Sequence, residues 1–457
     1  MYFSVVDTLE SFVWKLVAAG TLIFSWILAI TLFSKIYRLH KDGIDWAFSK
    51  EHSSGIIFGK KFGQMYISSL EAREGHICIL GPSGSGKTSG LLIPTLRNWR
   101  GTSFSIDIAG DIEKNVHQAK KLIYQPENLN STPYNVFYAI DIMEQDADKY
   151  EAIEKLAYLL MPELPPRESS ASAKFYNQEG RKILTAALLA GYGQGKDFIE
   201  ICKWVMTSSY QQLFHEIDQS GNELAIQYIN SFSGALSENT SGCKQAADLA
   251  IKLFATNEYV MNSIRRPKRG EASFDPGKIE IYNVFFVVSD AKLDVYAPLV
   301  HLVVAQVLEY FSVRSDEMKQ SILLCIDEAA SFGKLELTAA LRKLRKRRIR
   351  IITATQSLND WIMIYGEAET KAMLGNYAYK VILGANDYET AEFWAKSIGH
   401  KKSTRRSFQE GDKGGKVIHT EIKEFAYEPE ELGRLRNKLI LLYPGGYMML
   451  RKNYYFK

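Results

Sequence analysis

Residues 81–88 read Gly-Pro-Ser-Gly-Ser-Gly-Lys-Thr, and they match the phosphate-binding loop G-x-x-x-x-G-K-[ST] at every fixed position. An apolar run, Ile77–Leu80, precedes this loop, and Leu91–Ile93 follows it with helical spacing. That order is the strand–loop–helix setting that the motif requires. The alternative is an ordinary Gly/Ser-rich turn, which would not need those flanks. The sequence therefore predicts a nucleotide-binding site.

The chemistry expected of the loop follows from its residue types. Glycine lets the backbone bend until its N–H groups face a polyphosphate, and the positive end of the following helix adds to the attraction. Lys87 is expected to reach the β- and γ-phosphates, and the Thr88 hydroxyl to ligate Mg²⁺. The cofactors predicted are ATP and Mg²⁺. The residues predicted to contact the nucleotide are Gly81, Pro82, Ser83, Gly84, Ser85, Gly86, Lys87, Thr88 and Ser89.

A second motif supplies the carboxylates that hydrolysis needs. The apolar run 321–326 has the pattern of a buried strand and ends in Asp327-Glu328. The carboxyl ends of strands are where α/β sheets bind ligands. We expect Asp327 to hold the metal ion and Glu328 to polarise the attacking water. The alternative is a strand that ends in a solvated acidic turn, and the phosphate-binding loop argues against it.

The next predicted strand, Ile349–Thr355, ends at Gln356, whose polar side chain suits a sensor or water-positioning role beside the γ-phosphate. Between the two strands lies the basic run Leu341–Arg348, which we expect on the nucleotide pocket's edge of the sheet. Such charge runs are usually solvated faces. One of its arginines could instead complete the site of a neighbouring subunit as a finger in trans.

Composition bounds the class of protein. The chain has 457 residues, of which 46 % are apolar, so it can bury a large core in two or three units. Its net charge of +4 does not by itself indicate nucleic acid. The four cysteines show no C-x-x-C pairing, which favours reduced thiols and a cytosolic location for most of the chain.

The amino-terminal region differs from the rest. Leu16–Phe33 carries no charge over eighteen residues, about the length of a membrane-spanning helix. The bias of Lys and Arg toward its carboxyl flank predicts that this flank is cytoplasmic. A cleaved signal peptide lacks support because no small-x-small site follows the run, and a buried core helix is the other alternative. We predict a single transmembrane helix over about residues 12–33, with most of the chain in the cytoplasm.

Beyond the anchor, the periodicity divides the chain. Strands are predicted at His76–Leu80, Thr102–Asp107, Lys121–Tyr124, Glu280–Val288, Ile322–Asp327, Ile349–Thr355 and Tyr379–Leu383. The clearest helices are predicted at Tyr150–Met161, Ala173–Gly191, Asp248–Arg266, Ala297–Phe311 and Tyr388–Ile398. The end of the chain predicts hairpins, with a turn at Pro444–Gly446.

The pattern predicts an α/β fold: a RecA-like P-loop motor domain with a mostly parallel sheet, an all-α inserted domain and an N-terminal transmembrane helix. The predicted divisions are 1–40 for the anchor, 41–139 and 271–457 for the two parts of the nucleotide-binding domain, and 140–270 for the insert.

The ordered series of motifs resembles the TraG/TraD-type coupling proteins of type IV secretion and conjugation, which are relatives of the FtsK/HerA DNA pumps. The resemblance covers roughly residues 50–457. The residues that carry it are the loop with Leu91–Leu96, Asp107–Asp111, Ser131–Asn135, Phe274–Gly277, Ala297–Leu299, Asp327-Glu328, Thr355–Leu358, Leu383–Thr390 and Gly399. By the same resemblance, Arg345 takes the finger position. Two features depart from the family: only one membrane helix is found where two are usual, and Asp107–Asp111 lacks the family's lysine.

The resemblance implies a hexameric ring ATPase at the inner membrane. It would deliver a relaxase-bound single DNA strand, or effector proteins, to a type IV secretion channel. The basic clusters 265–269 and 342–350 could track phosphates. Two alternatives stay open: an FtsK/HerA-type DNA pump outside conjugation, and a nucleotide-gated recruitment platform with little motor activity.

Overall fold

The computed structural model describes residues 2–48, 55–63, 65–70, 75–108, 110–164, 170–409 and 416–456, without the side chains of 2–13 and 404–421. Its centre is a run of parallel strands, as predicted, which confirms the α/β class. In spatial order these strands are β10 (Tyr379–Ile382), β4 (Ile77–Leu80), β9 (Ile349–Thr355), β8 (Ile322–Ile326), β5 (Thr102–Ile108), β7 (Asn283–Val288) and β6 (Lys121–Tyr124).

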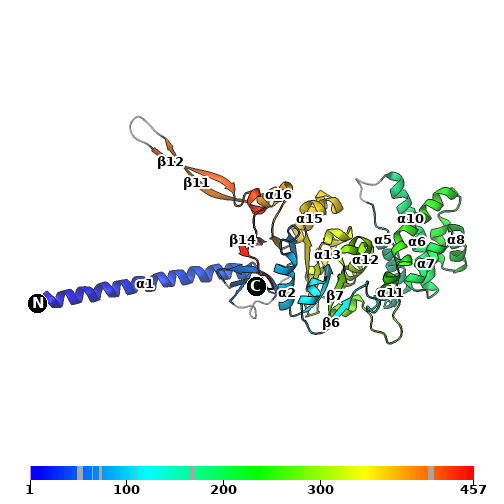
Figure 1. Ribbon diagram of the computed structural model, residues 1–457, viewed down its shortest axis with the longest axis horizontal. Helices are drawn as coiled ribbons and strands as arrows, with labels where there is room; N and C mark the ends of the chain where they lie inside the picture. The colour runs from blue at the N-terminus through cyan, green and yellow to red at the C-terminus, as the bar shows by residue number, and fades with distance from the viewer. Residues whose placement is uncertain are drawn as a thin grey trace.

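Antiparallel strands extend the sheet beyond β10. They are, in order, β13 (Lys438–Tyr443), β14 (Gly446–Arg451), β2 (Ile56–Lys61), β3 (Met65–Ser69) and β1 (Asp45–Ala47). The predicted turn at Pro444–Gly446 joins β13 to β14. The sequence analysis did not anticipate the three strands that precede the phosphate-binding loop. A separate two-stranded ribbon, β11 (His400–Gln409) with β12 (Lys416–Phe425), projects from the sheet domain (Figure 1).

Alternate residues of the central strands feed two hydrophobic cores, one on each face of the sheet. The face that carries Ile77 and Ile79 is covered by the π-helical turn η2 (Thr88–Leu92), α2 (Ile93–Asn98) and α3 (Asp111–Asn115). The opposite face is covered by α12 (Leu293–Ser312), α13 (Leu337–Lys343), α14 (Leu358–Tyr365), α15 (Glu367–Asn376), α16 (Tyr388–Ile398) and α17 (Pro429–Leu432). The short 3-10 turns are η3 (Pro276–Glu280), η4 (Asp290–Lys292), η5 (Ala329–Phe332) and η6 (Leu344–Arg347).

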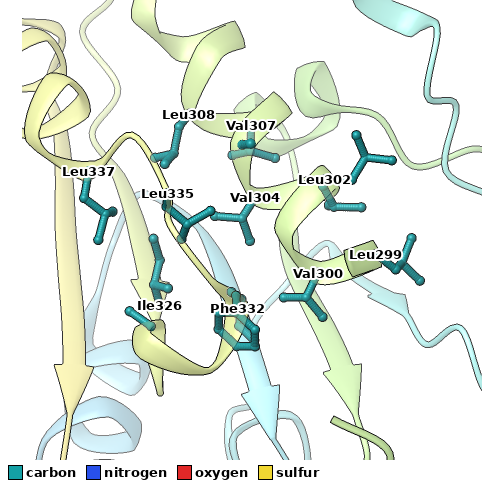
Figure 2. Close-up of a cluster of buried hydrophobic side chains, with 14 of the residues drawn as sticks. Leu299, Val300, Leu302, Val304, Val307, Leu308, Ile326, Phe332, Leu335 and Leu337 are labelled. Carbon is teal, nitrogen blue, oxygen red and sulfur yellow. The ribbon is translucent and has the colours of Figure 1, made fainter. Parts of the chain in front are cut away.

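Helix α12 packs its apolar side against the strand that carries the acidic motif. Figure 2 shows Val300 and Val304 of α12 beside Phe332 of η5, with Ile326 of β8 and Leu299 of α12 on either side in the same buried cluster. All five side chains are at most 2 % exposed. This packing holds the backbone immediately before and after Asp327-Glu328, and so positions the site.

The chain between β6 and β7 is helical, as expected, and lies at the end of the molecule away from α1 (Figure 1). Its helices are α4 (Tyr138–Asp141), α5 (Asp146–Leu160), α6 (Ala171–Gly193), α7 (Phe198–Thr207), α8 (Tyr210–Gln219), α9 (Glu223–Asn230), α10 (Ser237–Thr256) and α11 (Glu258–Ile264). Helices α5 and α10 contact α12, so the insert shares the core of the sheet domain. The domain limits at 140 and 270 stay a prediction.

One helix was predicted wrongly in this region. The sequence indicated a single helix over Asp248–Arg266, whereas α10 ends at Thr256 and α11 begins at Glu258. The cause is Asn257, whose side chain accepts a hydrogen bond from the Val260 N–H and thereby caps α11. Periodicity continues across this break, so it gives no warning of it.

The amino-terminal helix α1 (Tyr2–Lys41) projects from the sheet domain as a single rod of about 60 Å (Figure 1). It ends in a Schellman-type turn: Gly43 has φ +82° and the Ile44 N–H bonds the Leu39 carbonyl at 2.8 Å. Leu39 and Ile44 are buried in the sheet domain. Within the described residues, Trp14–Lys41 and Asp290–Ser312 are long and apolar enough to span a membrane. The apolar 18-residue window of the first helix has no buried residue, whereas half of the corresponding window of the second is buried. The second is the core helix α12, which leaves α1 as the candidate anchor.

Candidate nucleotide site

The predicted phosphate-binding loop connects β4 to the helical turn η2. The Gly81 N–H donates to the Thr355 carbonyl at 3.1 Å, which ties the loop to β9. Gly84 and Gly86 have φ of +71° and +92°, values that only glycine adopts without strain. A side chain on Gly81 would lie 2.6 Å from the Ser85 hydroxyl. The loop therefore has the local geometry of a phosphate cradle. Pro82, Ser83 and Ser89 stay predicted contacts of the nucleotide.

Lys87 is buried at the base of the loop, at 6 % exposure. Its Nζ donates to the Gly81 carbonyl at 2.9 Å and forms an ion pair with Glu328 Oε1 at 3.0 Å. The phosphate-binding loop and the Asp327-Glu328 motif, which lie far apart in the sequence, are therefore joined by the Lys87–Glu328 ion pair. An incoming phosphate group would compete with Glu328 for this lysine.

Thr88 and Asp327 meet in the same place. The Thr88 hydroxyl donates to Asp327 Oδ2 at 3.0 Å, and Asp327 Oδ1 accepts the Glu328 N–H at 3.0 Å. Burial, and then the neighbouring charge of Glu328, raise the pKa of Asp327, while Lys87 and Thr88 oppose that rise. A hydroxyl and a carboxylate oxygen at this separation are the hard oxygen ligands that Mg²⁺ prefers, so the residues fit the predicted metal.

Glu328 has a backbone conformation that the sequence does not reveal. Its φ of +48° and ψ of +45° place it in the left-handed region, which costs a non-glycine residue about 1 kcal/mol or more. The Glu328 carbonyl accepts the Ser331 N–H at 2.8 Å, and the buried Phe332 anchors the turn (Figure 2). This turn directs the side chain of Glu328 toward Lys87.

Gln356 follows β9 directly. Because Thr355 pairs with Leu80, Gln356 lies beside Gly81 at the carboxyl edge of the sheet, and its side chain is exposed. The next residue, Ser357, caps α14 with a capping box. Gln356 thus borders the loop, and its side chain is accessible to a bound group.

Arg345 does not lie at this edge, and the expected placement of the basic run beside the nucleotide pocket was wrong. The run begins in the last turn of α13 and continues through η6 to Arg348, at the amino ends of the strands. There the His76 ring bonds the Leu341 carbonyl at 2.9 Å, and Ile322 N–H bonds the Arg348 carbonyl. The seven residues of β9 separate the two edges by about 20 Å. Arg345 is exposed, and its own chain's loop is out of its reach.

The altered motif after β5 is a structural cap. Asp107 is fully buried, and its carboxylate accepts the backbone N–H groups of Ile112 and Glu113 at 3.0 and 2.6 Å, so it holds the start of α3. Burial raises the pKa of Asp107 to about 6. Gly110 has φ +78°, and Ala109 lies outside the described residues.

Sequence reasoning missed a further group at the loop. Lys452 follows β14, is 8 % exposed, and donates from Nζ to the Ser85 carbonyl at 2.7 Å. The Tyr455 N–H donates to the Ser89 carbonyl at 3.0 Å, and Tyr454 lies against Gly86. Burial lowers the pKa of Lys452 to about 8. No motif marks these residues, because only the pairing of β14 into the sheet brings them to the loop.

Fold and site together define a RecA-like P-loop protein with paired carboxylates at its loop. Three comparisons refine this class. The sequence model of the family described as "Type IV secretory system Conjugative DNA transfer" matches residues 34–457. This chain therefore belongs to that family, and the resemblance stated from the sequence is confirmed.

Individual relatives agree. Protein VirD4 of Agrobacterium fabrum is 23 % identical over 378 residues, which cover 77 % of this chain and 54 % of that protein. The conjugal transfer protein TraG of the same organism is 22 % identical over 344 residues, covering 71 % of this chain and 51 % of that one. The chain thus spans about half the length of these curated relatives.

Solved structures share the fold. The unbound bacterial conjugative coupling protein TrwB has a TM-score of 0.69 at 19 % identity, with 89 % of each chain covered. TrwB in complex with the non-hydrolysable analogue ADPNP has a TM-score of 0.68 at 20 % identity, with 92 % of each chain covered. At these identities the likeness establishes the mostly parallel sheet with its helical insert.

Proposed function

We propose that this chain is an inner-membrane ATPase that couples DNA or protein substrates to a type IV secretion channel. The observation that carries the ATPase is the joining of two distant motifs, Lys87 to Glu328 and Thr88 to Asp327, each at 3.0 Å. A solvated acidic turn would have no reason to meet a phosphate-binding loop in this way.

The residues divide the work of hydrolysis as follows. Thr88 and Asp327 would hold Mg²⁺, which neutralises developing phosphate charge when bound. Lys87 leaves Glu328 for the phosphates, because a polyphosphate offers it more negative charge. Glu328, released from the ion pair, accepts the proton of the attacking water and orients it. Gln356, beside Gly81, is placed to sense or position groups at the γ-phosphate.

The transport function rests on family membership together with the anchor. We propose a homohexamer at the bacterial inner membrane, crossed once by α1, with the sheet domain and insert in the cytoplasm. Its cargo would be a relaxase-bound single strand of DNA or effector proteins. Its other partners would be components of the secretion channel. Supporting features are the conjugative-transfer family and the exposed basic residues Arg342, Lys343 and Arg345.

Two other functions make different predictions. A recruitment platform would dock cargo on the helical insert and use nucleotide only to set its shape. In that case Lys87→Ala would still transfer cargo at a reduced rate, whereas a motor would stop. A pump of the FtsK/HerA type would be active without a relaxase or channel. The neighbouring genes test this alternative, because relaxase or channel genes there would favour conjugation.

The direct test is ATP hydrolysis by the detergent-solubilised full chain, with and without single- and double-stranded DNA. We expect Mg²⁺-dependent turnover that DNA stimulates and that Lys87→Ala abolishes. Lys196→Ala, at a partly exposed lysine in the insert, is the matched control and should retain turnover. Absence of hydrolysis by the native protein in every condition would overturn the ATPase proposal. Hydrolysis that no DNA alters would favour protein cargo.

A further inference from the structure

The segment that follows β14, residues Lys452–Phe456, lies on the outer side of the phosphate-binding loop. It is held there at three points: Lys452 Nζ on the Ser85 carbonyl, the Tyr455 N–H on the Ser89 carbonyl, and the Tyr454 ring against Gly86. A Cβ atom placed on Gly86 would lie only 3.0 Å from Tyr454 Cε1. The segment is therefore packed on the loop itself.

Sheet order determines which part of a nucleotide faces this segment. Asp327, Glu328 and Gln356 follow β8 and β9, which lie on one side of β4, so the metal and γ-phosphate belong on that side. β10, β13 and β14 lie on the other side of β4, and the segment continues from β14. Because the phosphates run along the loop and the first turn of its helix, the ribose and base leave toward the side opposite the γ-phosphate. That is the side on which Tyr454 lies.

The chemistry of the segment suits a base. The rings of Tyr454 and Phe456 are stacked, with centroids 5.3 Å apart and an interplanar angle of 26°. Tyr454 is partly exposed and Phe456 is 61 % exposed, so the pair presents aromatic surface beside the loop. Aromatic side chains bind bases by stacking, which every base permits.

We propose that Tyr454 and Phe456 form the base subsite of the nucleotide pocket, with Lys452 as the positioning residue that ties this subsite to the phosphate-binding loop. The inference rests on the proposed ATPase function and deepens it. The ligand class is a purine nucleoside triphosphate. The energy of stacking depends on the area of the base and little on its substituents. ATP and GTP should therefore bind with similar affinity, and CTP, which has a smaller base, should bind more weakly.

The test compares ATP with inorganic tripolyphosphate, which has the phosphates but no base, by calorimetric titration of the detergent-solubilised full chain. Tyr454→Ala should weaken ATP binding about tenfold, a modest value for one lost base–aromatic stack, and leave tripolyphosphate binding unchanged. Tyr454→Phe should retain ATP affinity. Phe456→Ala, at an exposed position that tolerates truncation, should weaken ATP binding in the same selective way.

The variant Lys452→Met tests whether Lys452 positions the aromatic pair on the loop without itself contacting the base. Because Lys452 holds the aromatic pair against the Ser85 carbonyl, this variant should weaken ATP binding more than tripolyphosphate binding, whereas a residue that only supports the loop would weaken both by equal factors. Tyr259→Ala, at a 43 % exposed tyrosine of α11 in the helical insert, is the control and should change neither affinity.

The outcomes are distinguishable. If Tyr454→Ala and Phe456→Ala bind ATP as tightly as the native protein, the base subsite is wrong while the ATPase proposal stands. Equal weakening of tripolyphosphate and ATP in both aromatic variants would make the segment a support of the loop only, and would also overturn the subsite. A native protein that binds neither ligand would instead contradict the proposed function.

Discussion

At the scale of single residues, Glu328 and an incoming triphosphate would compete for the ammonium group of Lys87. Its ion pair with Glu328 and its bond to the Gly81 carbonyl occupy the same ammonium group that a triphosphate needs. The left-handed backbone of Glu328 keeps its carboxylate within reach of that group. In the proposed mechanism, binding of a polyphosphate to Lys87 would therefore release the Glu328 carboxylate in the same event, and nucleotide occupancy would prepare the site for hydrolysis.

The substitution Glu328→Gln tests this competition. We expect turnover to fall at least about a hundredfold, because the amide cannot accept a proton from the attacking water. ATP affinity should be equal or higher, since Lys87 no longer has an anionic partner to leave. Hydrolysis rate and equilibrium binding, measured on the same preparation, check both parts. Undiminished turnover would remove Glu328 from the mechanism.

Asp107 gives a pH dependence with a defined sign. Its pKa is about 6 in the fold against an ordinary value of 3.8, so the stability that it contributes is fully present below pH 3.8 and is lost as the pH rises through about 6. Asp107→Asn removes this titration. Between pH 5 and pH 7.5 the variant should therefore gain about 1 kcal/mol of unfolding free energy relative to the native chain. Thermal unfolding of both proteins across this range checks it, and a constant difference at every pH would contradict it.

At the scale of elements, α1 has two parts with different roles. The candidate span over Leu16–Phe33 is exposed, whereas Leu39 near its carboxyl end is buried in the sheet domain. Because the helix continues unbroken between them, the candidate anchor is joined rigidly to the sheet. If the candidate span crosses a membrane, its direction would set the orientation of the sheet domain.

Two truncations separate these parts. Removal of residues 2–33 should give a soluble chain with nearly native unfolding temperature, because the long exposed apolar run is gone and Leu39 remains. Removal of residues 2–41 should also give a soluble chain, but one destabilised by about 2 kcal/mol or more through the loss of Leu39. Sedimentation after a salt wash and thermal unfolding measure these outcomes. A shorter truncation that still pelleted with membranes would refute the single anchor.

At the scale of the whole molecule, the placement of Arg345 bears on assembly. It lies at the amino edge of the sheet, and about 20 Å separates this edge from the carboxyl edge that carries its own phosphate-binding loop. A finger role in cis is therefore excluded by distance, and a role in trans requires a neighbouring subunit that presents this edge to the loop of the first. The proposed ring would have to bring these two edges together at each subunit interface.

The ring predicts complementation between variants. Arg345→Ala should abolish most hydrolysis while leaving ATP affinity nearly intact, because a finger acts on transition-state charge. A mixture of Arg345→Ala with Lys87→Ala should recover part of the activity, since one subunit supplies the loop and the other the arginine. Activity of the native protein should also rise more steeply than linearly with concentration.

The control for this experiment is Lys346→Ala, at the exposed neighbour of Arg345. If Lys346→Ala loses activity and Arg345→Ala does not, the finger is assigned to the wrong residue. If mixtures of Arg345→Ala and Lys87→Ala co-assemble but stay inactive, Arg345 is an ordinary surface residue and not a finger in trans.

Local features of the chain could be predicted from the sequence, because their causes are local. The phosphate-binding loop, β9 at Ile349–Thr355 and α16 at Tyr388–Ile398 were found at their observed limits, since backbone freedom of glycine, strand alternation and capping act between near neighbours. The meeting of the loop with Asp327-Glu328 was also predictable, because parallel strands bring their carboxyl ends to one edge.

Only the tertiary structure decided the rest. The antiparallel strands beside β10, the edge on which Arg345 lies, and the contact of Lys452 with a loop 367 residues away depend on which strands pair and in which direction. Strand pairing is selected by burial of whole faces across the molecule, and no short window of sequence contains that information. The sequence by itself therefore determined the loop and the carboxylates, while the fold decided what else surrounds them.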